Sequence, residues 1–205
     1  MAERYLARSD LRPSPVRMWF LSEALARIGG GAEVPDVGCG AGIPMTLALA
    51  SGRRVTGIDI SARQIELARA NVPDAAFVRS DFTTMDWPSR SVDAVTAFYA
   101  FVHVPRVEQQ RLLERIAEWL RPGGALLAQF GSADTRDQVE EGWLGVPMFF
   151  AGFAPEHNED MLMRAGFLLE LSEVREEEED SGEVVRFHHV AARVPSGLGS
   201  TALGP

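Results

Sequence analysis

The stretch VPDVGCGAG, residues 34–42, decides the fold class of this chain. It opens with a β-favouring run, which leads directly into three glycines at a spacing of two, and a helical stretch begins near Ile43. The pattern predicts a strand, a tight turn and a helix. Such a turn binds anionic groups, because free N–H groups of the helix face the ligand and side-chain bulk is absent. We therefore expect a ligand site at Gly38, Gly40 and Gly42.

The glycine spacing differs from that of the dinucleotide-binding fingerprint. The fingerprint is GxGxxG, but its sixth position, counted from Gly38, is Ile43, and the third glycine comes one residue early at Gly42. A nicotinamide oxidoreductase is therefore the disfavoured interpretation. Pro35 adds an irregularity, because proline cannot donate to the ladder of a central strand. We expect the strand either to begin after Pro35 or to be bulged there.

Outward from this motif, apolar runs bounded by turn residues alternate with stretches of helical period, which is typical of βαβ units around a parallel sheet. Strands are expected at 33–37, 54–59, 75–79, 91–99 and 125–130, followed by a hairpin of 167–175 and 184–194. Helices are expected at 14–28, 43–50, 62–71, 107–120 and 156–165. The segment 131–155 lacks a clear period, so we expect it to cap the sheet.

The composition is that of a soluble globular domain. With 205 residues, 46% of them hydrophobic and 24% charged, the chain can bury a core without disulfides or a structural metal. No apolar run approaches the ~20 residues that span a bilayer. The stretch MAERYLARSD has no apolar segment followed by a cleavage site, and Cys39 is the only cysteine. We therefore expect a cytoplasmic protein.

The formal net charge of −9 is concentrated in one segment. Residues 173–183 hold seven acids and one base, a net of −6, which leaves −3 for the rest of the chain. Because no stripe of basic residues is present, we expect neither a nucleic acid nor a membrane as a partner. We expect the acidic segment to be a solvated loop, and the protein to be a monomer or a homodimer.

The glycine motif resembles the first motif of class I S-adenosylmethionine-dependent methyltransferases, in which an acid and an apolar residue precede GxGxG. The matching positions are Asp36, Val37, Gly38, Gly40 and Gly42.

Three further segments follow in the family's order, over residues 33–131. Asp59 ends the stretch VTGID, and in the family this acid accepts hydrogen bonds from the ribose hydroxyls, since an acceptor-only carboxylate can take both protons. Asp81 and Phe82, in SDFTTMDW, resemble the edge that binds adenine. RIAEWLRPGGALLAQF, residues 115–130, is similar to the family's helix, Pro-Gly-Gly turn and fifth strand. Four motifs in order make the resemblance specific.

The resemblance implies an α/β fold: a Rossmann-like, seven-stranded, mostly parallel sheet with an antiparallel last strand, helices on both faces and a helical lid. We expect one domain over 1–194, with a lid made by the N-terminal helix within 1–30 and the cap insert 131–155, and a disordered tail at 195–205. The implied cofactor is S-adenosylmethionine. The residues implied to bind it are Asp36, Gly38, Cys39, Gly40, Gly42, Asp59, Ile60, Asp81, Phe82 and Phe98.

These residues also have an interpretation without a ligand. The three glycines could form only a tight strand-to-helix turn. Asp59 could cap the following helix, and Asp81 could cap a turn ahead of Thr83 and Thr84. The fold class does not depend on this choice.

A catalytic base is expected at His103. An alcohol, phenol or protonated amine reacts faster in an in-line displacement when a general base takes its proton, and histidine serves near neutral pH. His103 follows the fourth expected strand at the carboxyl edge, where ligands of open α/β sheets bind, although it could instead pack ahead of Pro105. His157, His188 and His189 are expected to be solvated or structural. No spacing of histidines or cysteines matches a zinc site, so no metal is expected.

Aromatic side chains, most of them outside the shared sheet, indicate the kind of acceptor. Concave sites are lined mainly by apolar and aromatic groups, so we expect an apolar or aromatic small molecule as the methyl acceptor. The residues expected to bind it are Tyr5, Trp19, Tyr99, Trp143, Phe149 and Phe150.

We therefore expect methyl transfer to an oxygen or nitrogen of a metabolite, with a carbon acceptor as the lesser alternative. The segment AFYAF, 97–101, is unlike the Asn/Asp-Pro-Pro-Tyr/Phe motif of family members that act on bases and protein amides. Two other classes stay open: a protein of this fold that binds the cofactor without transferring a methyl group, or one that uses the pocket for another reaction, such as a cyclisation.

Overall fold

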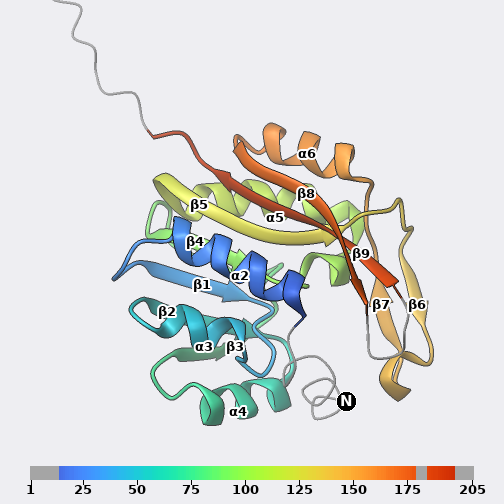
Figure 1. The fold of residues 1–205 in the computed structure, drawn as a ribbon, viewed down its shortest axis with the longest axis horizontal. Coiled ribbons are helices and arrows are strands. Elements are labelled where there is room, and N and C mark those ends of the chain that lie inside the picture. Colours follow the sequence, from blue (N-terminus) through green and yellow to red (C-terminus); the bar gives the residue numbers. More distant parts are fainter. Residues whose placement is uncertain (1–13, 179–183, 197–205) are drawn as a thin grey trace, which may run out of the picture.

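Seven strands form one sheet: β1 (Glu33–Val37), β2 (Arg54–Asp59), β3 (Ala76–Arg79), β4 (Val92–Ala97), β5 (Leu120–Gly131), β8 (Leu168–Glu178) and β9 (Val184–Arg193). Their order across the sheet is β3-β2-β1-β4-β5-β9-β8. The pairs among β1 to β5 are parallel, whereas β9 runs antiparallel to both of its neighbours, β5 and β8. The expected α/β fold with a mostly parallel sheet and an antiparallel last strand is confirmed (Figure 1).

The computed structural model describes residues 14–178 and 184–196. Tyr5, the first part of the expected lid segment, residues 179–183 at the end of the acidic segment and most of the expected tail lie outside the described residues.

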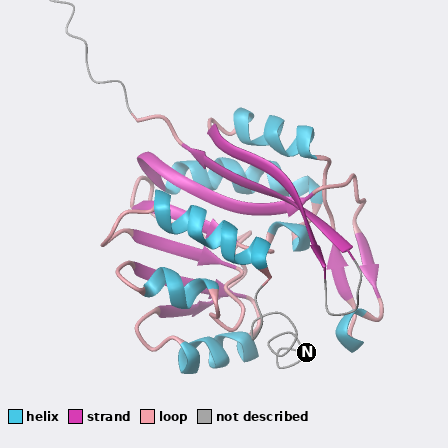
Figure 2. Ribbon diagram, viewed as in Figure 1, coloured by secondary structure: helices cyan, strands magenta, loops and turns pink. Residues whose placement is uncertain are grey.

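Helices cover both faces of the sheet (Figure 2): α2 (Pro15–Arg27), α3 (Met45–Ala50), α4 (Ala62–Asn71), α5 (Arg106–Trp119) and α6 (Pro155–Arg164). Successive apolar side chains of β5 point to opposite faces of the sheet, so this strand contributes to the apolar core on both faces. Leu126 belongs to the apolar cluster under α5 and α6, and the next residue, Leu127, belongs to the cluster under α2 and α3. A third cluster joins α4 to β3 through Ile65 and Phe77.

Pro35 does not interrupt the first strand. β1 begins at Glu33 and pairs with β2 in one continuous register, in which Pro35 lies opposite Thr56. Its pairing with β4, in contrast, is limited to Asp36 opposite Thr96. The expectation of a late start or a bulge at Pro35 is therefore wrong. Because β1 pairs with β4 only at Asp36, the absence of an N–H group on Pro35 does not interrupt that pairing.

The insert 131–155 is a β-hairpin, so the expected lid is not helical in this part. Strands β6 (Gln138–Glu140) and β7 (Met148–Phe150) pair antiparallel, with Val139 opposite Phe149, and η3 (Trp143–Gly145) lies between them. Gly142 and Gly145, which flank Trp143 and Leu144, disfavour a continuous helix here, and so does Pro147. The hairpin lies beyond the carboxyl ends of the parallel strands (Figure 1), where a ligand of this fold would bind.

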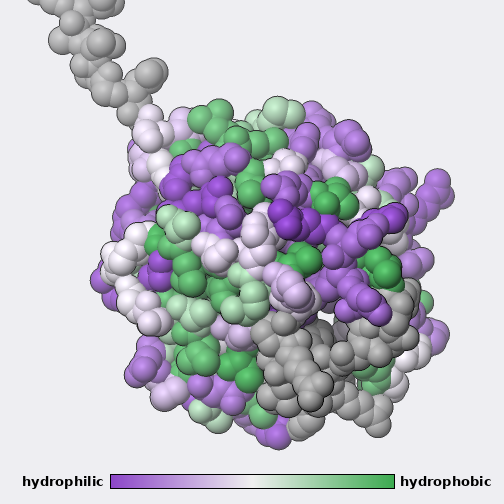
Figure 3. All heavy atoms as spheres, in the orientation of Figure 1, coloured by the Kyte–Doolittle hydropathy of each residue, from purple (hydrophilic) through white to green (hydrophobic). Residues whose placement is uncertain are grey.

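Hydrophilic side chains predominate along β8 and β9 on the face seen in Figure 3. A glutamate of β8 forms an ion pair with an arginine of β9, that of Glu176 with Arg186. Charged side chains on an edge strand prevent it from pairing with another sheet. No helix in the described part of the chain is long and apolar enough to cross a membrane.

Candidate functional site

A cleft opens at the carboxyl ends of β1 and β4. The strand order reverses between these two strands, and ligands of open α/β sheets bind at such a switch point. The residues that line the cleft are Arg17, Asp36, Gly38, Cys39, Gly40, Ile43, Met45, Phe98 and Tyr99. The structure therefore brings together five of the residues expected to bind the cofactor, and Tyr99 from the residues expected to bind the acceptor.

The glycines of the loop have positive φ angles, and their lack of a Cβ atom leaves room for neighbouring groups. Gly38 and Gly40 both have positive φ angles, +71° and +56°. A Cβ atom on Gly38 would lie 2.7 Å from the Cβ atom of Ala100, so this glycine lets the loop pack against the end of β4. A Cβ atom on Gly40 would meet only the Nε2 atom of Gln64, at 4.0 Å. The backbone at Gly40 thus faces open space in the cleft, as a bound ligand requires.

Asp59 ties the glycine loop to the end of β2. Its Oδ2 atom accepts the N–H of Gly40 at 3.0 Å, and its Oδ1 atom accepts the N–H of Ser61 at 2.8 Å. Burial raises the pKa of Asp59, and these two N–H groups oppose the rise. The helix cap is Ser61, whose Oγ accepts the N–H of Gln64, so Asp59 is not itself the N-cap. Each carboxylate oxygen keeps a lone pair for a ligand hydroxyl.

Asp36 is buried at the end of β1 and joins three elements. Its carboxylate accepts the hydroxyl of Thr46 at 2.6 Å and that of Thr96 at 2.7 Å, one on each oxygen. Desolvation is the largest effect on this group and raises the pKa of Asp36 to about 6, although both hydroxyls lower it. Asp36 therefore fixes α3 and β4 against β1 while it also lines the cleft.

The raised pKa makes stability depend on pH. The folded state holds a proton on Asp36 more tightly than the unfolded chain, so the free energy of unfolding should fall as pH rises from about 4 to about 6. Asp36→Asn should remove this part of the pH dependence and raise stability at pH 7 by up to about 3 kcal/mol, because 1 pKa unit corresponds to 1.36 kcal/mol. Denaturant titrations of both proteins between pH 4 and pH 8 measure the difference, and identical slopes would contradict the assignment.

Asp81 and Phe82 lie outside the residues that line the cleft. The Oδ1 atom of Asp81 accepts both the N–H of Thr83, at 2.9 Å, and its hydroxyl, at 2.8 Å. Phe82 packs against the apolar cluster under α5 and α6. The local turn that was the alternative for Asp81 is present, and a contact of either residue with a cofactor stays a prediction. Ile60, next to Asp59, is 65% exposed.

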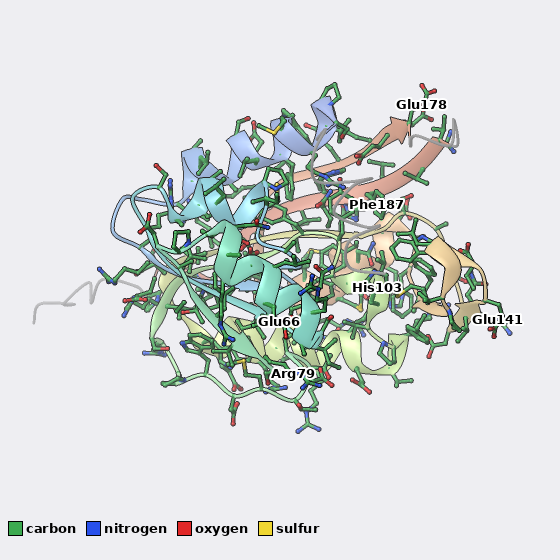
Figure 4. All side chains as sticks on the ribbon, turned by 90° about the horizontal axis from the view of Figure 1, so that it is seen from below. Glu66, Arg79, His103, Glu141, Glu178 and Phe187 are labelled. Carbon is green, nitrogen blue, oxygen red and sulfur yellow. The ribbon has the colours of Figure 1, made fainter. Side chains whose placement is uncertain are left out.

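His103 ends η2 (Phe101–His103) and contacts the hairpin (Figure 4). Its Nδ1 atom lies 2.8 Å from the carbonyl oxygen of Phe149. Because a carbonyl only accepts, Nδ1 carries the proton, and in the neutral ring Nε2 is the basic nitrogen. Among the described residues, Nε2 has no hydrogen-bond partner. The rings of Phe150 and Trp143 lie 5.1 Å and 6.5 Å from the imidazole.

The charge state of His103 suits a base. Although the residue keeps exposed surface, desolvation by the surrounding protein lowers the pKa of His103, against the opposing effects of the Phe149 carbonyl and the negative charge of Asp59. The imidazole is therefore neutral at pH 7.

The other aromatic and histidine residues occupy structural positions. Trp19 lies under the guanidinium of Arg175, 3.6 Å from it, and is absent from the residues lining the cleft. His188 accepts or donates a hydrogen bond at Ser172, and His189 bonds to Gln129 in the core. Within residues 14–178 and 184–196, no group of three or more histidine, cysteine, aspartate or glutamate residues could hold a metal ion.

Sequence reasoning missed Arg17. This residue is only 7% exposed, it lines the cleft, and its guanidinium carbon lies 4.5 Å from the centre of the Tyr99 ring. It comes three and four positions before the buried residues Phe20 and Leu21, and therefore shares their face of α2. A charged residue on the buried face of an amphipathic helix was the signal that could have revealed it.

Comparisons with known proteins agree with this geometry. The sequence profile of a family described as methyltransferase domain matches residues 34–124. Sterol methyltransferase-like 1 of Botryococcus braunii is 39% identical over 48% of this chain, and methyltransferase GfsG of Streptomyces halstedii is 30% identical over 77% of it. The 27-O-demethylrifamycin SV methyltransferase of Amycolatopsis mediterranei is 36% identical over 58% of the chain. The chain spans 27%, 61% and 45% of the length of these three relatives, respectively.

Two solved structures share the fold. A methyltransferase from Methanosarcina mazei superposes with a TM-score of 0.74 at 20% identity, and the match covers 84% of this chain and 97% of that one. The [4+2]-cyclase SpnF superposes with a TM-score of 0.67 at 19% identity, over 92% and 86% of the two chains. Together with the profile match, the four ordered motifs and the sheet topology, these comparisons show the Rossmann-like methyltransferase fold and support a class I S-adenosylmethionine-dependent methyltransferase.

Proposed function

We propose that this protein transfers a methyl group from S-adenosylmethionine to an oxygen or nitrogen atom of an apolar small molecule. One observation carries the proposal: a neutral histidine with Nε2 available lies at the same sheet edge as the glycine loop and Asp59. The loop supplies a place for the cofactor, and the histidine supplies a base for the acceptor.

The residues of the cleft, together with those at the end of β2, fit this cofactor. Gly40 leaves its backbone open, Asp59 offers two carboxylate oxygens at the end of β2, and Phe98 contributes an apolar wall. The exposed side chain of Ile60 follows Asp59 and offers an apolar surface for the adenine ring. When bound, the cofactor supplies a methyl group on a sulfonium, which is reactive toward a nucleophile aligned with it.

His103 would act on the acceptor. As the acceptor oxygen or nitrogen gains the methyl group, it loses a proton, and Nε2 of His103 takes that proton. The hydrogen bond from Nδ1–H to the carbonyl of Phe149 holds the ring orientation and stabilises the imidazolium that forms. Trp143 and Phe150 pack around the ring and reduce its contact with water.

The surroundings of His103 favour an apolar or aromatic acceptor. The rings of Trp143 and Phe150 lie 5.8 Å apart at 73°, and the hairpin backbone at Phe149 holds them beside the base. An acceptor with a flat apolar body would pack on these rings. The name of the Amycolatopsis relative indicates methylation at an oxygen and that of the Botryococcus relative a sterol, and both are consistent with such an acceptor.

The first test is isothermal titration of the purified protein with S-adenosylmethionine, S-adenosylhomocysteine and NAD. We expect micromolar binding of the first two ligands, on the order of −8 kcal/mol, and no binding of NAD. Formation of S-adenosylhomocysteine in the presence of candidate phenols, alcohols and amines then tests transfer. Absence of binding by either sulfur-containing ligand would refute the proposal.

Asp59→Ala should weaken the binding of S-adenosylhomocysteine by about 1.5 to 3 kcal/mol, the scale of a hydrogen bond to a charged group. Asp93→Ala is the matched control, since Asp93 also accepts a backbone N–H, that of Glu33 at 2.9 Å, but lies at the opposite end of its strand. Calorimetry should give the control the affinity of the wild type. Equal affinities for all three proteins would exclude Asp59 from the cofactor site.

A second candidate function is catalysis of another reaction in the same pocket. The fold similarity to the [4+2]-cyclase SpnF favours its inclusion, because one fold hosts different reactions. Binding of S-adenosylmethionine without formation of S-adenosylhomocysteine, over a broad range of acceptors, would favour this candidate.

A further inference from the structure

The hairpin that contacts His103 is not part of the main sheet. Strands β6 and β7 form a two-stranded sheet of their own, and each has three residues. Such a hairpin is marginally stable by itself, so other contacts must hold it in place. It carries the carbonyl oxygen of Phe149, to which the imidazole of His103 is bonded. The orientation of His103 therefore depends on what holds the hairpin.

The two segments that enter and leave the hairpin meet at its base, beside η2. A Cβ atom on Gly152 would lie 3.3 Å from the Cα atom of Gly131, so the two backbones approach closely because both residues are glycines. The N–H of Ala151 donates to the carbonyl of Val102, in η2, at 2.8 Å. A group that ties these segments together therefore also fixes the hairpin relative to η2.

Asn158 of α6 is such a group. Its side chain is fully buried, and its Nδ2 atom lies 2.9 Å from the carbonyl oxygen of Gly131, where the insert begins, and 3.3 Å from that of Phe153, near its end. Its Oδ1 atom is buried and has no hydrogen-bond partner among the described residues. A buried oxygen without a partner is costly, and an apolar side chain of similar size would avoid that cost. The amide at this position therefore indicates a need for its two N–H donors.

His188 holds the amide in this orientation. The Nδ2 atom of Asn158 lies 3.2 Å from Nδ1 of His188, and Nε2 of the same ring lies 2.7 Å from Oγ of Ser172. The hydroxyl of Ser172 donates to Glu159, so its oxygen accepts the Nε2–H of His188 and Nδ1 is left as an acceptor. Burial lowers the pKa of His188 against the charges of Glu159 and Glu156, and the ring is neutral. A reversed amide would place its oxygen against three acceptors.

We infer that Asn158 is a positioning residue, which holds the base of the hairpin so that the carbonyl of Phe149 keeps the proton of neutral His103 on Nδ1. This inference rests on the proposed function, in which Nε2 of His103 takes the proton of the acceptor. Asn158 does not line the cleft, so its effect on the reaction passes through His103. The inference extends the site to α6, which follows the segment matched by the methyltransferase profile.

Nitrogen-15 NMR of the imidazole rings at pH 8 tests the inference without any acceptor. Asn158→Leu keeps the approximate size of the side chain and removes both donors. We expect the Nδ1–H tautomer of His103 in the wild type and a mixture of both neutral tautomers in the variant, because a ring without a fixed acceptor exchanges between them in water. The signals of His103 are those missing from His103→Ala. A variant that keeps the wild-type tautomer would overturn the inference.

Gln129→Met is the matched control. Gln129 is also a fully buried amide, its Nε2 bonds to His189 at 2.8 Å, and its oxygen too lacks a partner among the described residues. It lies two residues after Leu127 on β5 and so faces α2, on the other side of the sheet from Asn158. It should leave the tautomer of His103 unchanged. If it changed the tautomer as Asn158→Leu does, the cause would be a general loss of stability, and the inference would fail.

Reaction rates give an independent measurement. Asn158→Leu should lower kcat by roughly 10- to 100-fold, up to the contribution of a general base, and leave the affinity for S-adenosylhomocysteine unchanged. In a His103→Ala background the same substitution should have no further effect on kcat, because both changes remove one function. An equal loss of kcat in both backgrounds would show that Asn158 does not act through His103.

Ser172→Ala keeps the test available if Asn158→Leu does not fold, since Ser172 is exposed. It removes the acceptor for Nε2–H of His188 and so frees the ring that orients Asn158. We expect the same change of tautomer at His103 to a smaller extent, with kcat lower by roughly 2- to 5-fold. An unchanged tautomer and rate would contradict the inference. A wild type that methylates no acceptor would refute the proposed function, whereas the tautomer of His103 would still decide this inference.

Discussion

Replacing His103 by alanine should lower the rate of methyl transfer at pH 7 by roughly 100-fold or more, the usual contribution of a general base. The affinity for S-adenosylmethionine should not change, because the proposed function assigns the imidazole to the acceptor and not to the cofactor. The wild-type rate should fall as pH drops below the lowered pKa of His103, since an imidazolium cannot accept a proton. His103→Ala should lack this acidic limb. Initial rates between pH 5 and pH 8, with an acceptor found by screening, measure both effects.

A second variant separates the base from its structural contact. His103→Asn places an amide N–H near the position of Nδ1–H, so it can keep the bond to the Phe149 carbonyl, but it has no counterpart of Nε2. We expect it to be as slow as His103→Ala. If the asparagine variant recovered the wild-type rate, His103 would only hold the hairpin in place. His157→Ala serves as the control, because His157 stacks on Phe153 at 4.0 Å on the exposed side of α6 and should be dispensable.

Replacing Gly38 by alanine should destabilise the protein by about 2 to 5 kcal/mol and abolish cofactor binding. Two costs combine. An alanine at a φ of +71° costs roughly 1 to 2 kcal/mol, and its Cβ atom, 2.7 Å from that of Ala100, adds about 1 to 3 kcal/mol of overpacking. Because neither atom is the end of a flexible side chain, the loop itself must move. Urea denaturation and calorimetry with S-adenosylhomocysteine measure the two consequences.

Two further variants separate these costs. Gly52→Ala carries the strain alone, since its φ is +94° and nothing lies within 4 Å of the added Cβ atom, so it should lose only roughly 1 to 2 kcal/mol. In the double variant Gly38→Ala/Ala100→Gly the close contact is removed while the strain stays. We expect that pair to regain stability relative to Gly38→Ala and to show a coupling between the two sites. Equal losses for Gly38→Ala and Gly52→Ala would mean that the contact with Ala100 does not constrain the loop.

Much of the glycine-loop side of the candidate site could be predicted because its signals are local. Asp36, Gly38 and Gly40 fall within five consecutive residues at the end of β1, and all of them line the cleft. Asp59 ends the next strand, and its bond to the N–H of Gly40 joins the two turns. In a parallel sheet the carboxyl ends of neighbouring strands meet at one edge, so the order of motifs along the chain is enough to bring these residues together.

The insert and Pro35 show where local patterns fail. The hairpin at 138–150 has strands of three residues, too short for a period to appear, and it is held by contacts such as that of His103 with Phe149. Pro35 is tolerated because β1 pairs with β4 at one position only, Asp36 opposite Thr96. The extent of that pairing depends on the register of two strands that lie 60 residues apart in the sequence.

By itself, the sequence determined the fold class, the position of the glycine loop and the sheet edge where His103 lies, since strand, turn and helix signals act over a few residues. Only the tertiary structure decided that Nε2 is the basic nitrogen of His103, because Phe149 is 46 residues away. It also decided that Arg17 enters the cleft beside Tyr99. The direction, burial and protonation of a side chain depend on the neighbours that folding brings to it, and no local pattern records those neighbours.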